Sequence, residues 1–318
     1  MDIAQLPQFT PLVKDYLRAF DRTPIRDFFA VAPQAPHEQM RALLDRRLAL
    51  NRSRPQEFRT TVANAIRELH IKLCDHPATA KNLERIESAD TFAIVTGQQT
   101  GILGGPLYTF YKAFTAVALA KKMWKEFPEF SFVPMFWIET EDHDFEEIAS
   151  TTVLDAEGQP KTVRYVPEAL RANPGMKWQK QAGPMPLELE PLAEFFQELR
   201  SALPGSNFSS EVLELFQHSY RDGHTFAEAF AGILHAFFAE DGLLLVDANR
   251  RELKMLARDL FRHEIESSPE LSERIIRQSE KLEEGYHAQV KPRALNLFYL
   301  NDEKERVAIN EKERSDEA

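Results

Sequence analysis

Apolar positions in the first 90 residues recur at the three- and four-residue spacing of amphipathic helices. Between His37 and Asn51 a row of leucines runs among arginines, which predicts a helix with a basic outer face. Pro55 suits the first turn of a second helix, because the missing N–H of proline costs nothing there. A third helix is expected from Pro77. The pattern therefore predicts a helical N-terminal region over residues 1–90.

Two uninterrupted apolar runs, at residues 91–95 and 132–138, break the helical pattern. Their shortness, their β-branched and aromatic content and their lack of polar alternation predict parallel strands buried on both faces. A glycine-rich loop at 96–106 and a long amphipathic helix lie between them. A strand, a loop, a helix and a second strand form a βαβ unit. Residues 91–155 are therefore expected to fold as the first half of a Rossmann-like core.

Residues 156–218 are expected to form an inserted connecting segment, because the regular βαβ pattern stops there. Two short strands near 151–153 and 162–166 flank a turn signal, and this arrangement predicts a hairpin. A stretch rich in proline and glycine, at 167–186, is typical of a crossing loop. Two further helices are expected after it.

The core pattern resumes at 219–266, where a helix precedes the apolar strand Leu243–Asp247. The last region, 267–318, is predicted to contain the start of a coiled-coil-like helical arm, a hairpin at 296–309 and a charged tail from Glu311. An ordinary surface helix is the alternative to the arm. The predicted fold class is α/β, with a Rossmann-like parallel-sheet core. The arm is indicated by apolar positions spaced alternately four and seven residues apart, at Leu271, Ile275, Leu282 and Tyr286.

Length, charge and cysteine content limit the classes of protein to which the chain can belong. The chain has 318 residues, enough for one large domain or two ordinary ones. Its 39 Lys and Arg against 50 Asp and Glu give a net charge of −11, which argues against a nucleic-acid partner. The single cysteine, Cys74, excludes an internal disulfide framework and fits the reducing cytoplasm. No apolar run reaches the ~20 residues of a membrane span and no signal-peptide pattern is present, so a cytoplasmic protein without a membrane partner is expected.

The glycine-rich loop is the strongest chemical signal in the sequence. Gly97, Gly101 and Gly104 let the backbone come close to a ligand, and the start of the following helix is expected to offer unpaired N–H groups to an anion. Lys112 lies within that helix, in reach of a phosphate. The spacing matches neither the dinucleotide-binding fingerprint nor the P-loop. A glycine turn that only packs tightly is the alternative.

Two adjacent amides, Gln98 and Gln99, stand in the same loop. They have little packing value at the end of a strand, but their donors and acceptors suit a polar ligand. In open α/β sheets, ligands bind beyond the carboxyl ends of the strands. The amides therefore favour a ligand site over a purely structural turn.

A dense acidic run at 139–147 follows the second predicted strand and contains Asp142, His143 and Asp144. Carboxylates around one histidine can orient an amine, bind Mg²⁺ or form an acid/base pair. Zinc is a further alternative, although no second histidine stands at helical spacing. A solvated acidic helix start is the structural alternative. It accounts for the last two glutamates of the run better than for the histidine.

These segments together resemble the cysteine ligase family of bacillithiol biosynthesis. The resemblance extends from the N-terminal helices to about residue 300, and its most specific parts are Gly-Gln-Gln at 97–99 and Glu-Asp-His-Asp at 141–144. Further matching blocks are Gly105-Pro106-x-Tyr108-x-x-x-Lys112, Val133-Pro134-x-Phe136-Trp137, Tyr220-x-x-x-x-Thr225, Gly242-Leu243-x-Leu245-x-Asp247 and Gly285-Tyr286-His287-Ala288-Gln289.

The resemblance implies a Rossmann-like core with inserted connecting segments and a coiled-coil arm that pairs two subunits as a homodimer. It implies a ligase that joins the carboxyl group of cysteine to the amine of glucosaminyl malate. Such an amide bond needs carboxyl activation, for which ATP or another adenosine nucleotide, with Mg²⁺, is the simplest donor. Members of the family continue past the end of this chain, so the chain is expected to lack the family's C-terminal part.

On this interpretation, the candidate catalytic residues are Lys112, Asp142, His143 and Asp144. The lysine neutralises developing negative charge, and the acidic group with its histidine handles the amine and its proton. No particular set of metal ligands is predicted. The candidate substrate- or phosphate-binding residues are Gly97, Gln98, Gln99, Gly101, Gly105 and Tyr108.

Three alternatives to a ligase stay open. The first is a nucleotide- or sugar-binding Rossmann-like module without catalysis, and the second is an inactive fragment of a longer enzyme. The third is an oxidoreductase that uses the βαβ unit for NAD, with Glu139 holding a ribose. The missing G-x-G-x-x-G pattern speaks against this third alternative.

Overall fold

A computed structural model describes residues 6–21, 25–32, 35–73, 76–203, 205, 208–289, 293 and 295–309. Cys74 and the charged tail from Glu311 lie outside the described residues. The chain divides into two compact units. The first comprises Met1–Arg54, Ala257–Tyr299 and Val307–Ala318, and the second comprises Pro55–Leu256 and Leu300–Arg306. The predicted core belongs to the second unit.

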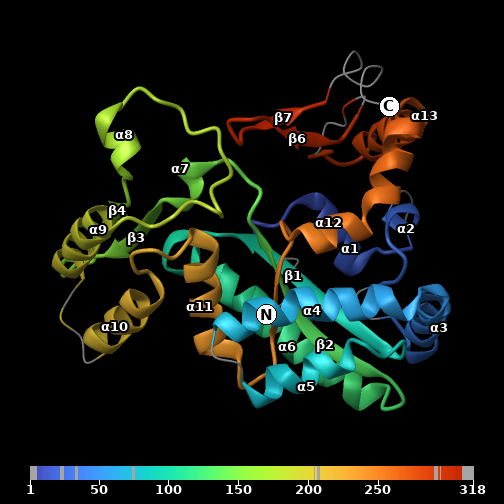
Figure 1. The fold of residues 1–318 in the computed structure, drawn as a ribbon. Coiled ribbons are helices and arrows are strands. Elements are labelled where there is room, and N and C mark those ends of the chain that lie inside the picture. The colour runs from blue at the N-terminus through green and yellow to red at the C-terminus, as the bar shows by residue number, and fades with distance from the viewer. Residues whose placement is uncertain are drawn as a thin grey trace. The chain divides into compact units, whose positions relative to one another are not determined.

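The centre of the second unit is a parallel three-stranded sheet (Figure 1). Its strands are β1 (Thr91–Gln99), β2 (Ser131–Glu139) and β5 (Leu244–Asp247), in the order β1-β2-β5. Helix α6 (Tyr108–Glu126) connects β1 to β2 and packs on both strands. This arrangement confirms the predicted α/β fold with a Rossmann-like parallel core.

Helices cover the central strand of this sheet from both sides, because its side chains alternate between two apolar faces. Phe136 and Ile138 of β2 pack with α6 and α11 (Phe226–Phe238). Val133 points the other way and packs with α4 (Gln56–Lys72) and α5 (Pro77–Arg85). These three side chains are fully buried. Each contributes roughly 1.5–3 kcal/mol of burial free energy.

Strand β1 departs from the expectation that it is buried on both faces. Ala93 is exposed, and the side chain of Val95 is 57% exposed. Among the described strands β1 pairs only with β2, so it lies at an edge of this sheet. Helix α6 covers one of its faces, whereas α4 and α5 pack on β5 and β2 instead. The apolar run correctly predicts a strand, but it does not reveal an edge position.

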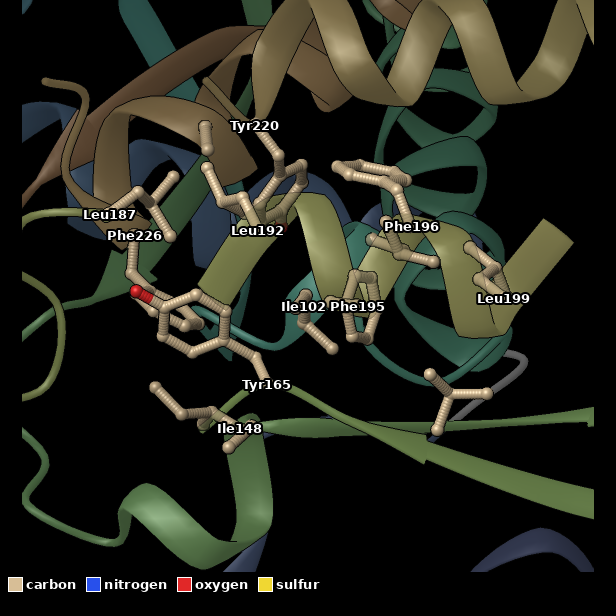
Figure 2. Close-up of a cluster of buried hydrophobic side chains, with 14 of the residues drawn as sticks. Ile102, Ile148, Tyr165, Leu187, Leu192, Phe195, Phe196, Leu199, Tyr220 and Phe226 are labelled. Carbon is tan, nitrogen blue, oxygen red and sulfur yellow. The ribbon is translucent and has the colours of Figure 1, made fainter. Parts of the chain in front are cut away.

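A separate hydrophobic core, mostly from residues 145–226, includes the predicted connecting segment (Figure 2). Phe195 and Phe196 of α9 pack there with Tyr165 and Phe226, while Ile102 brings the glycine-rich loop into the same cluster. The predicted hairpin is confirmed as an antiparallel pair. The elements of this region are α7 (Phe145–Ile148), β3 (Ser150–Leu154), β4 (Pro160–Arg164), α8 (Glu168–Ala172), α9 (Leu189–Ala202) and α10 (Ser209–Ser219).

The first unit is mainly helical. Its long helix α13 continues through Pro269, although the sequence pattern predicts a boundary near residue 266. Proline removes one backbone hydrogen bond from a helix, yet α13 continues through it, and the neighbouring Ser268 and Ser272 are buried. The pairing of two subunits through this arm stays a prediction. The helices are α1 (Pro11–Arg18), α2 (Ile25–Phe28), α3 (His37–Ser53) and α13 (Arg258–Glu283).

The remaining described elements are short. The turn between β1 and α6 contains the 3-10 helix η2 (Ile102–Gly104), and α12 (Arg251–Leu256) follows β5. Strands β6 (Phe298–Leu300) and β7 (Arg306–Ala308) pair with each other, in agreement with the predicted hairpin. Among the described helices, none combines the length and the apolar character needed to cross a membrane.

Candidate active site

The candidate residues gather where β1 and β2 end. The two strands are in register up to their last residues, with Gln98 opposite Ile138 and Gln99 opposite Glu139. The glycine-rich loop leaves β1 at this edge, and the acidic run leaves β2 at the same edge. Parallel strands present their carboxyl ends together, so the two motifs meet because of the sheet topology.

A continuous chain of side-chain hydrogen bonds joins the two motifs. Lys112 Nζ donates to Gln98 Oε1 at 2.9 Å, and Gln98 Nε2 donates to Gln99 Oε1 at 3.0 Å. Gln99 Nε2 then donates to Asp142 Oδ2 at 3.3 Å and to Glu147 Oε2 at 3.1 Å. The two amides therefore bridge a cation on α6 and carboxylates beyond β2. We call Gln98, Gln99, Lys112 and Asp142 the relay cluster.

Tyr108 supports the cationic end of the relay cluster. It lies one helical turn before Lys112, so both side chains share a face of α6. The Lys112 ammonium sits 5.0 Å from the centre of the tyrosine ring, and it also donates to the Gly97 carbonyl at 3.3 Å. The Tyr108 hydroxyl accepts a hydrogen bond from Gln98 at 3.3 Å. The lysine charge is thus fixed beside the end of β1 by three different groups.

The glycines of the loop have clear steric roles. A Cβ atom at Gly97 would lie 2.7 Å from the Trp137 carbonyl oxygen, and one at Gly101 would lie 2.7 Å from Gly105 Cα. Gly104 and Gly105 adopt φ values of +87° and +71°, which side chains disfavour. The alternative of a tightly packed turn therefore accounts for the glycines themselves, while the ligand hypothesis rests on the amides and the lysine.

The start of α6 differs from the expected anion site. The N–H of Thr109 donates to the Pro106 carbonyl at 2.8 Å, and the N–H of Phe110 donates to the Leu107 carbonyl at 3.1 Å. The loop already turns before Tyr108, so its carbonyls satisfy donors that the sequence interpretation left free for a ligand. Positive charge at this edge comes from the side chain of Lys112 instead.

Tyr220 packs in the hydrophobic cluster of Figure 2 and contacts the glycine-rich loop from there. Its hydroxyl donates to the Gly101 carbonyl at 3.0 Å and accepts from the Gly104 N–H at 3.4 Å. Burial raises the pKa of Tyr220 well above its ordinary value, because the phenolate would be desolvated. Burial likewise raises the pKa of Tyr165 to about 12, and that hydroxyl accepts from the N–H of Glu188. Both phenols therefore act as neutral structural groups at ordinary pH.

The acidic run divides into residues with different tasks. Asp142 Oδ1 accepts the backbone N–H of His143 at 2.8 Å, and the imidazole Nδ1 lies 3.5 Å from the same oxygen. The His143 side chain is half exposed to solvent. Asp144 caps α7 by accepting the N–H of Glu147 at 3.2 Å. Glu146 lies outside the relay cluster, where a hydrogen bond from Arg164 lowers its pKa.

A metal centre receives no support from this geometry. Within the described ranges, no group of three or more His, Cys, Asp and Glu side chains is arranged to hold a metal ion. Glu139 accepts the N–H of Glu141, and Glu141 forms an ion pair with Lys254, so these acids point to other partners. Mg²⁺ commonly binds through one or two carboxylates together with substrate phosphates, and a site of that kind needs no preformed protein cage.

Comparison with known families shows to which family the chain belongs. Residues 1–317 match the family described as bacillithiol biosynthesis BshC, N-terminal Rossmann-like domain. The chain belongs to the BshC family. This finding confirms the resemblance carried by the glycine-glutamine and acidic blocks.

Individual members of the BshC family are similar over much of the chain. A protein of Chlorobaculum tepidum is 41% identical over 232 residues, which cover 73% of this chain and 40% of the relative. One from Salinibacter ruber is 32% identical over 94% of this chain and 52% of its own length. One from Bacillus cereus is 31% identical over 81% and 46% respectively. All three are named "putative cysteine ligase BshC". The aligned region thus spans about half the length of these BshC relatives.

The contacts of two residues near the relay cluster were not predicted from the sequence. Glu147 was attributed to a solvated helix start, yet it accepts a hydrogen bond from Gln99. Tyr220 belongs to a block that resembles the family, Tyr220-x-x-x-x-Thr225, and that block was the available signal for its contact with the loop. Spacing along the chain marks such residues but does not say what they touch.

Proposed function

We propose that the chain carries the cysteine-adding ligase activity of bacillithiol biosynthesis. The reaction joins the carboxyl carbon of cysteine to the amine nitrogen of glucosaminyl malate. The observation that carries this proposal is the relay cluster, which links a fixed cation to carboxylates through two amides in a member of the BshC family. The names of the relatives support the same reaction class.

The cationic end of the relay cluster suits the carboxyl group. Attack by an amine on an activated carboxyl places negative charge on oxygen, and preorganised donors stabilise such charge. Lys112 offers a donor of this kind beside the end of β1, because its ammonium has three N–H donors and gives two of them to Gln98 and Gly97. Tyr108 adds a hydroxyl to the same group. These residues therefore bind and polarise the carboxyl or its phosphate-bearing leaving group.

The acidic end suits the amine. A protonated sugar amine must lose protons before and during attack, and a carboxylate or imidazole within reach accepts them. Asp142 and the exposed His143 stand together here, with the carboxylate oriented by Gln99 and by the backbone of the acidic run. Asp144 holds α7 in place and thereby positions this segment. Carboxyl activation by an adenosine nucleotide completes the proposal.

Product formation tests the proposal most directly. The purified chain is mixed with cysteine, glucosaminyl malate, ATP and Mg²⁺, and the thiol product is followed by mass spectrometry. We expect Lys112→Ala to lower the rate about 10²- to 10³-fold, because a donor to the developing oxyanion is lost. Lys121→Ala is the matched control, since Lys121 lies on the same helix α6 and pairs with Asp241 away from the relay cluster.

Three results separate the alternatives. Product from the unsubstituted chain and from Lys121→Ala, with loss in Lys112→Ala, supports the ligase. Binding of ATP or of the sugar without turnover supports a binding module. Equal rates in Lys112→Ala and in the unsubstituted chain would exclude the relay cluster as the catalytic site.

A further inference from the structure

A small cavity opens between the carboxyl ends of β2 and β5, on the side of β2 away from β1. Its volume is about 180 Å³, and all of its lining belongs to the second unit. Ordinary pockets for drug-sized ligands measure roughly 300–1,000 Å³, so this cavity suits a much smaller molecule. Its wall is formed by Leu69, Lys72, Ile138, Thr140, Pro184, Thr225, Ala227, Glu228, Asp247 and Arg250.

The charges around this cavity cancel. Lys72 and Arg250 supply two cations, and Glu228 and Asp247 supply two carboxylates. Lys72 pairs with Glu228 at 2.8 Å, while Arg250 pairs with Glu68, outside the cavity lining, at 2.7 Å. A site for a free phosphate or a nucleotide needs a surplus of positive charge, which is missing here. A zwitterion, with one charge of each sign, matches a lining of this kind.

Two of these charged groups have a donor or an acceptor that makes no hydrogen bond with the described residues. Asp247 Oδ1 accepts from the Thr140 hydroxyl at 2.7 Å and from the N–H of Asn249 at 3.0 Å. Its second oxygen, Oδ2, makes no hydrogen bond with any residue that the structure describes. Arg250 uses Nη2 for Glu68 and for the Ala65 carbonyl, and its buried Nε is without a partner in the described part of the chain. One carboxylate oxygen and one guanidinium N–H therefore make no hydrogen bond with the described residues.

A turn brings these two lining residues close together in the chain. The N–H of Arg250 donates to the Asp247 carbonyl at 3.4 Å, so the residues stand three apart across one turn after β5. The apolar wall consists of Ile138, which is fully buried, and Leu69, which is nearly so, together with Pro184 and Ala227. The cavity thus combines a carboxylate, a guanidinium and apolar side chains within a small space.

We propose that this cavity binds a free α-amino acid with a small side chain. The ammonium group is held by Asp247 Oδ2, the carboxylate by the Arg250 guanidinium, and the side chain by the apolar wall. A thiol behaves as a small apolar group in such surroundings. The identification of the amino acid as cysteine rests on the proposed function, whereas the charge pattern alone indicates the amino-acid class.

The cavity stands close enough to the relay cluster to serve the same reaction. Gln98 of β1 and Asp247 of β5 are both in register with Ile138 of β2. Adjacent strands lie ~4.8 Å apart, so these two positions are separated by about 10 Å across the sheet edge. Thr140 borders the cavity and Asp142 belongs to the relay cluster, and only one residue separates them in the chain.

Calorimetric titration of the 318-residue chain with L-cysteine, under a non-thiol reductant, tests the assignment. Asp247→Asn keeps the oxygen that holds Thr140 but loses the charge, and Arg250→Gln removes the guanidinium. We expect each to weaken binding about 10- to 100-fold, the effect of losing a hydrogen bond to a charged group. Lys121→Gln is the control and keeps full affinity. Cysteamine, without a carboxylate, and 3-mercaptopropionate, without an amine, are expected to bind at least tenfold more weakly than cysteine.

The outcomes distinguish this inference from the proposed function. Cysteine binding that is lost in Asp247→Asn and Arg250→Gln, with both variants still folded by circular dichroism, supports both. Cysteine binding that these variants leave intact, and that Lys112→Ala abolishes, overturns the cavity assignment and keeps the ligase. Binding of L-alanine or L-serine but not cysteine, sensitive to the same variants, keeps the cavity and overturns cysteine as the substrate. No binding of any of these amino acids to the unsubstituted chain overturns the cavity assignment.

Discussion

Two polar sites flank the end of β2, and they are built in opposite ways. In the relay cluster on the β1 side, the polar side chains are hydrogen-bonded to one another and are half-buried. In the cavity on the β5 side, charged groups retain unused donors and acceptors within a recess. A cluster whose polar groups are already hydrogen-bonded to one another is suited to polarising a ligand and exchanging protons with it. A recess with unused donors and acceptors is suited to binding a ligand.

One segment of the insertion touches both sites. The N–H of Ala182 donates to the carbonyl of Asp142 at 2.8 Å, while the carbonyl of Gly183 accepts from the N–H of Ala227 at 3.0 Å. Pro184 continues into the cavity wall. We call Ala182, Gly183 and Pro184 the strap. The relay cluster and the cavity are therefore supported by the same segment. The following variants test the relay cluster, the strap and the cavity in turn.

The largest effect is expected from Asp142→Asn, which removes a carboxylate from the relay cluster but keeps its size. We expect kcat to fall about 10²-fold, because proton transfer from the amine is lost. The KM for cysteine stays unchanged, since the cavity is untouched. Steady-state rates of thiol formation measure both constants. Glu146→Gln serves as the control, because Glu146 lies in the same acidic run but pairs with Arg164. A rise in the KM for cysteine in Asp142→Asn would contradict the separation of the two sites.

An intermediate effect is expected from Gly183→Ala in the strap. The added Cβ would lie 2.6 Å from Thr140 Cα, so the backbone must shift. Overpacking of this kind costs about 1–3 kcal/mol of unfolding free energy. Urea denaturation measures that cost, and affinity for cysteine is expected to drop with it. Gly175→Ala is the matched control in the same crossing segment, where the nearest atom is 3.9 Å away. Equal stability of the two variants would show that the strap is not tightly packed.

The smallest effect is expected from Glu228→Gln at the mouth of the cavity. Burial acts to raise the pKa of Glu228, but hydrogen bonds from Lys72 and the Thr225 N–H outweigh it and leave this pKa below its ordinary value. The charged form therefore stabilises the fold above about pH 4.5. That contribution is lost as the pH falls through the lowered pKa.

Urea unfolding at several pH values checks this expectation. Glutamine preserves the amide acceptor for Thr225, so the variant reports mainly on charge. At pH 7 the loss is expected to be about 1 kcal/mol or less, as for other partly exposed pairs, and it shrinks below pH 4.5. Glu211→Gln on α10 is the control, since Glu211 forms no ion pair within the described residues. A loss that persists unchanged at pH 3 would point to packing rather than to charge.

The sequence predicts well those features that depend on local pattern. The apolar runs at 91–95 and 132–138 correctly indicate parallel strands, and their carboxyl ends correctly bring Gln99 and Asp142 to one edge. The same pattern cannot tell an edge strand from a central one, because neighbouring strands are chosen by tertiary pairing. For this reason the exposure of Val95 is visible only in the fold.

The cavity is beyond reach of sequence reasoning for a different reason. Its charged groups come from the end of α4, the start of α11, the end of β5 and the turn after β5, so that Lys72 and Arg250 stand far apart in the chain. No spacing rule connects them, and Lys72 alone looks like an ordinary surface cation. The helix boundary predicted near residue 266 is wrong, because α13 continues through Pro269 although proline lacks a backbone N–H.

The buried phenol of Tyr220 has a consequence for how the molecule opens. Its hydroxyl ties two backbone groups of the glycine-rich loop to a side chain that packs in the core of the insertion. The loop cannot leave this position without stranding the phenol or exposing that core. The N–H of Gly104 is shared between the Tyr220 hydroxyl and the Gly101 carbonyl, so its hydrogen is expected to exchange with solvent slowly, and only when the loop turn and the contact with Tyr220 both open. The exchange rate of this one backbone hydrogen therefore measures how stable the glycine-rich loop is in its place at the candidate site.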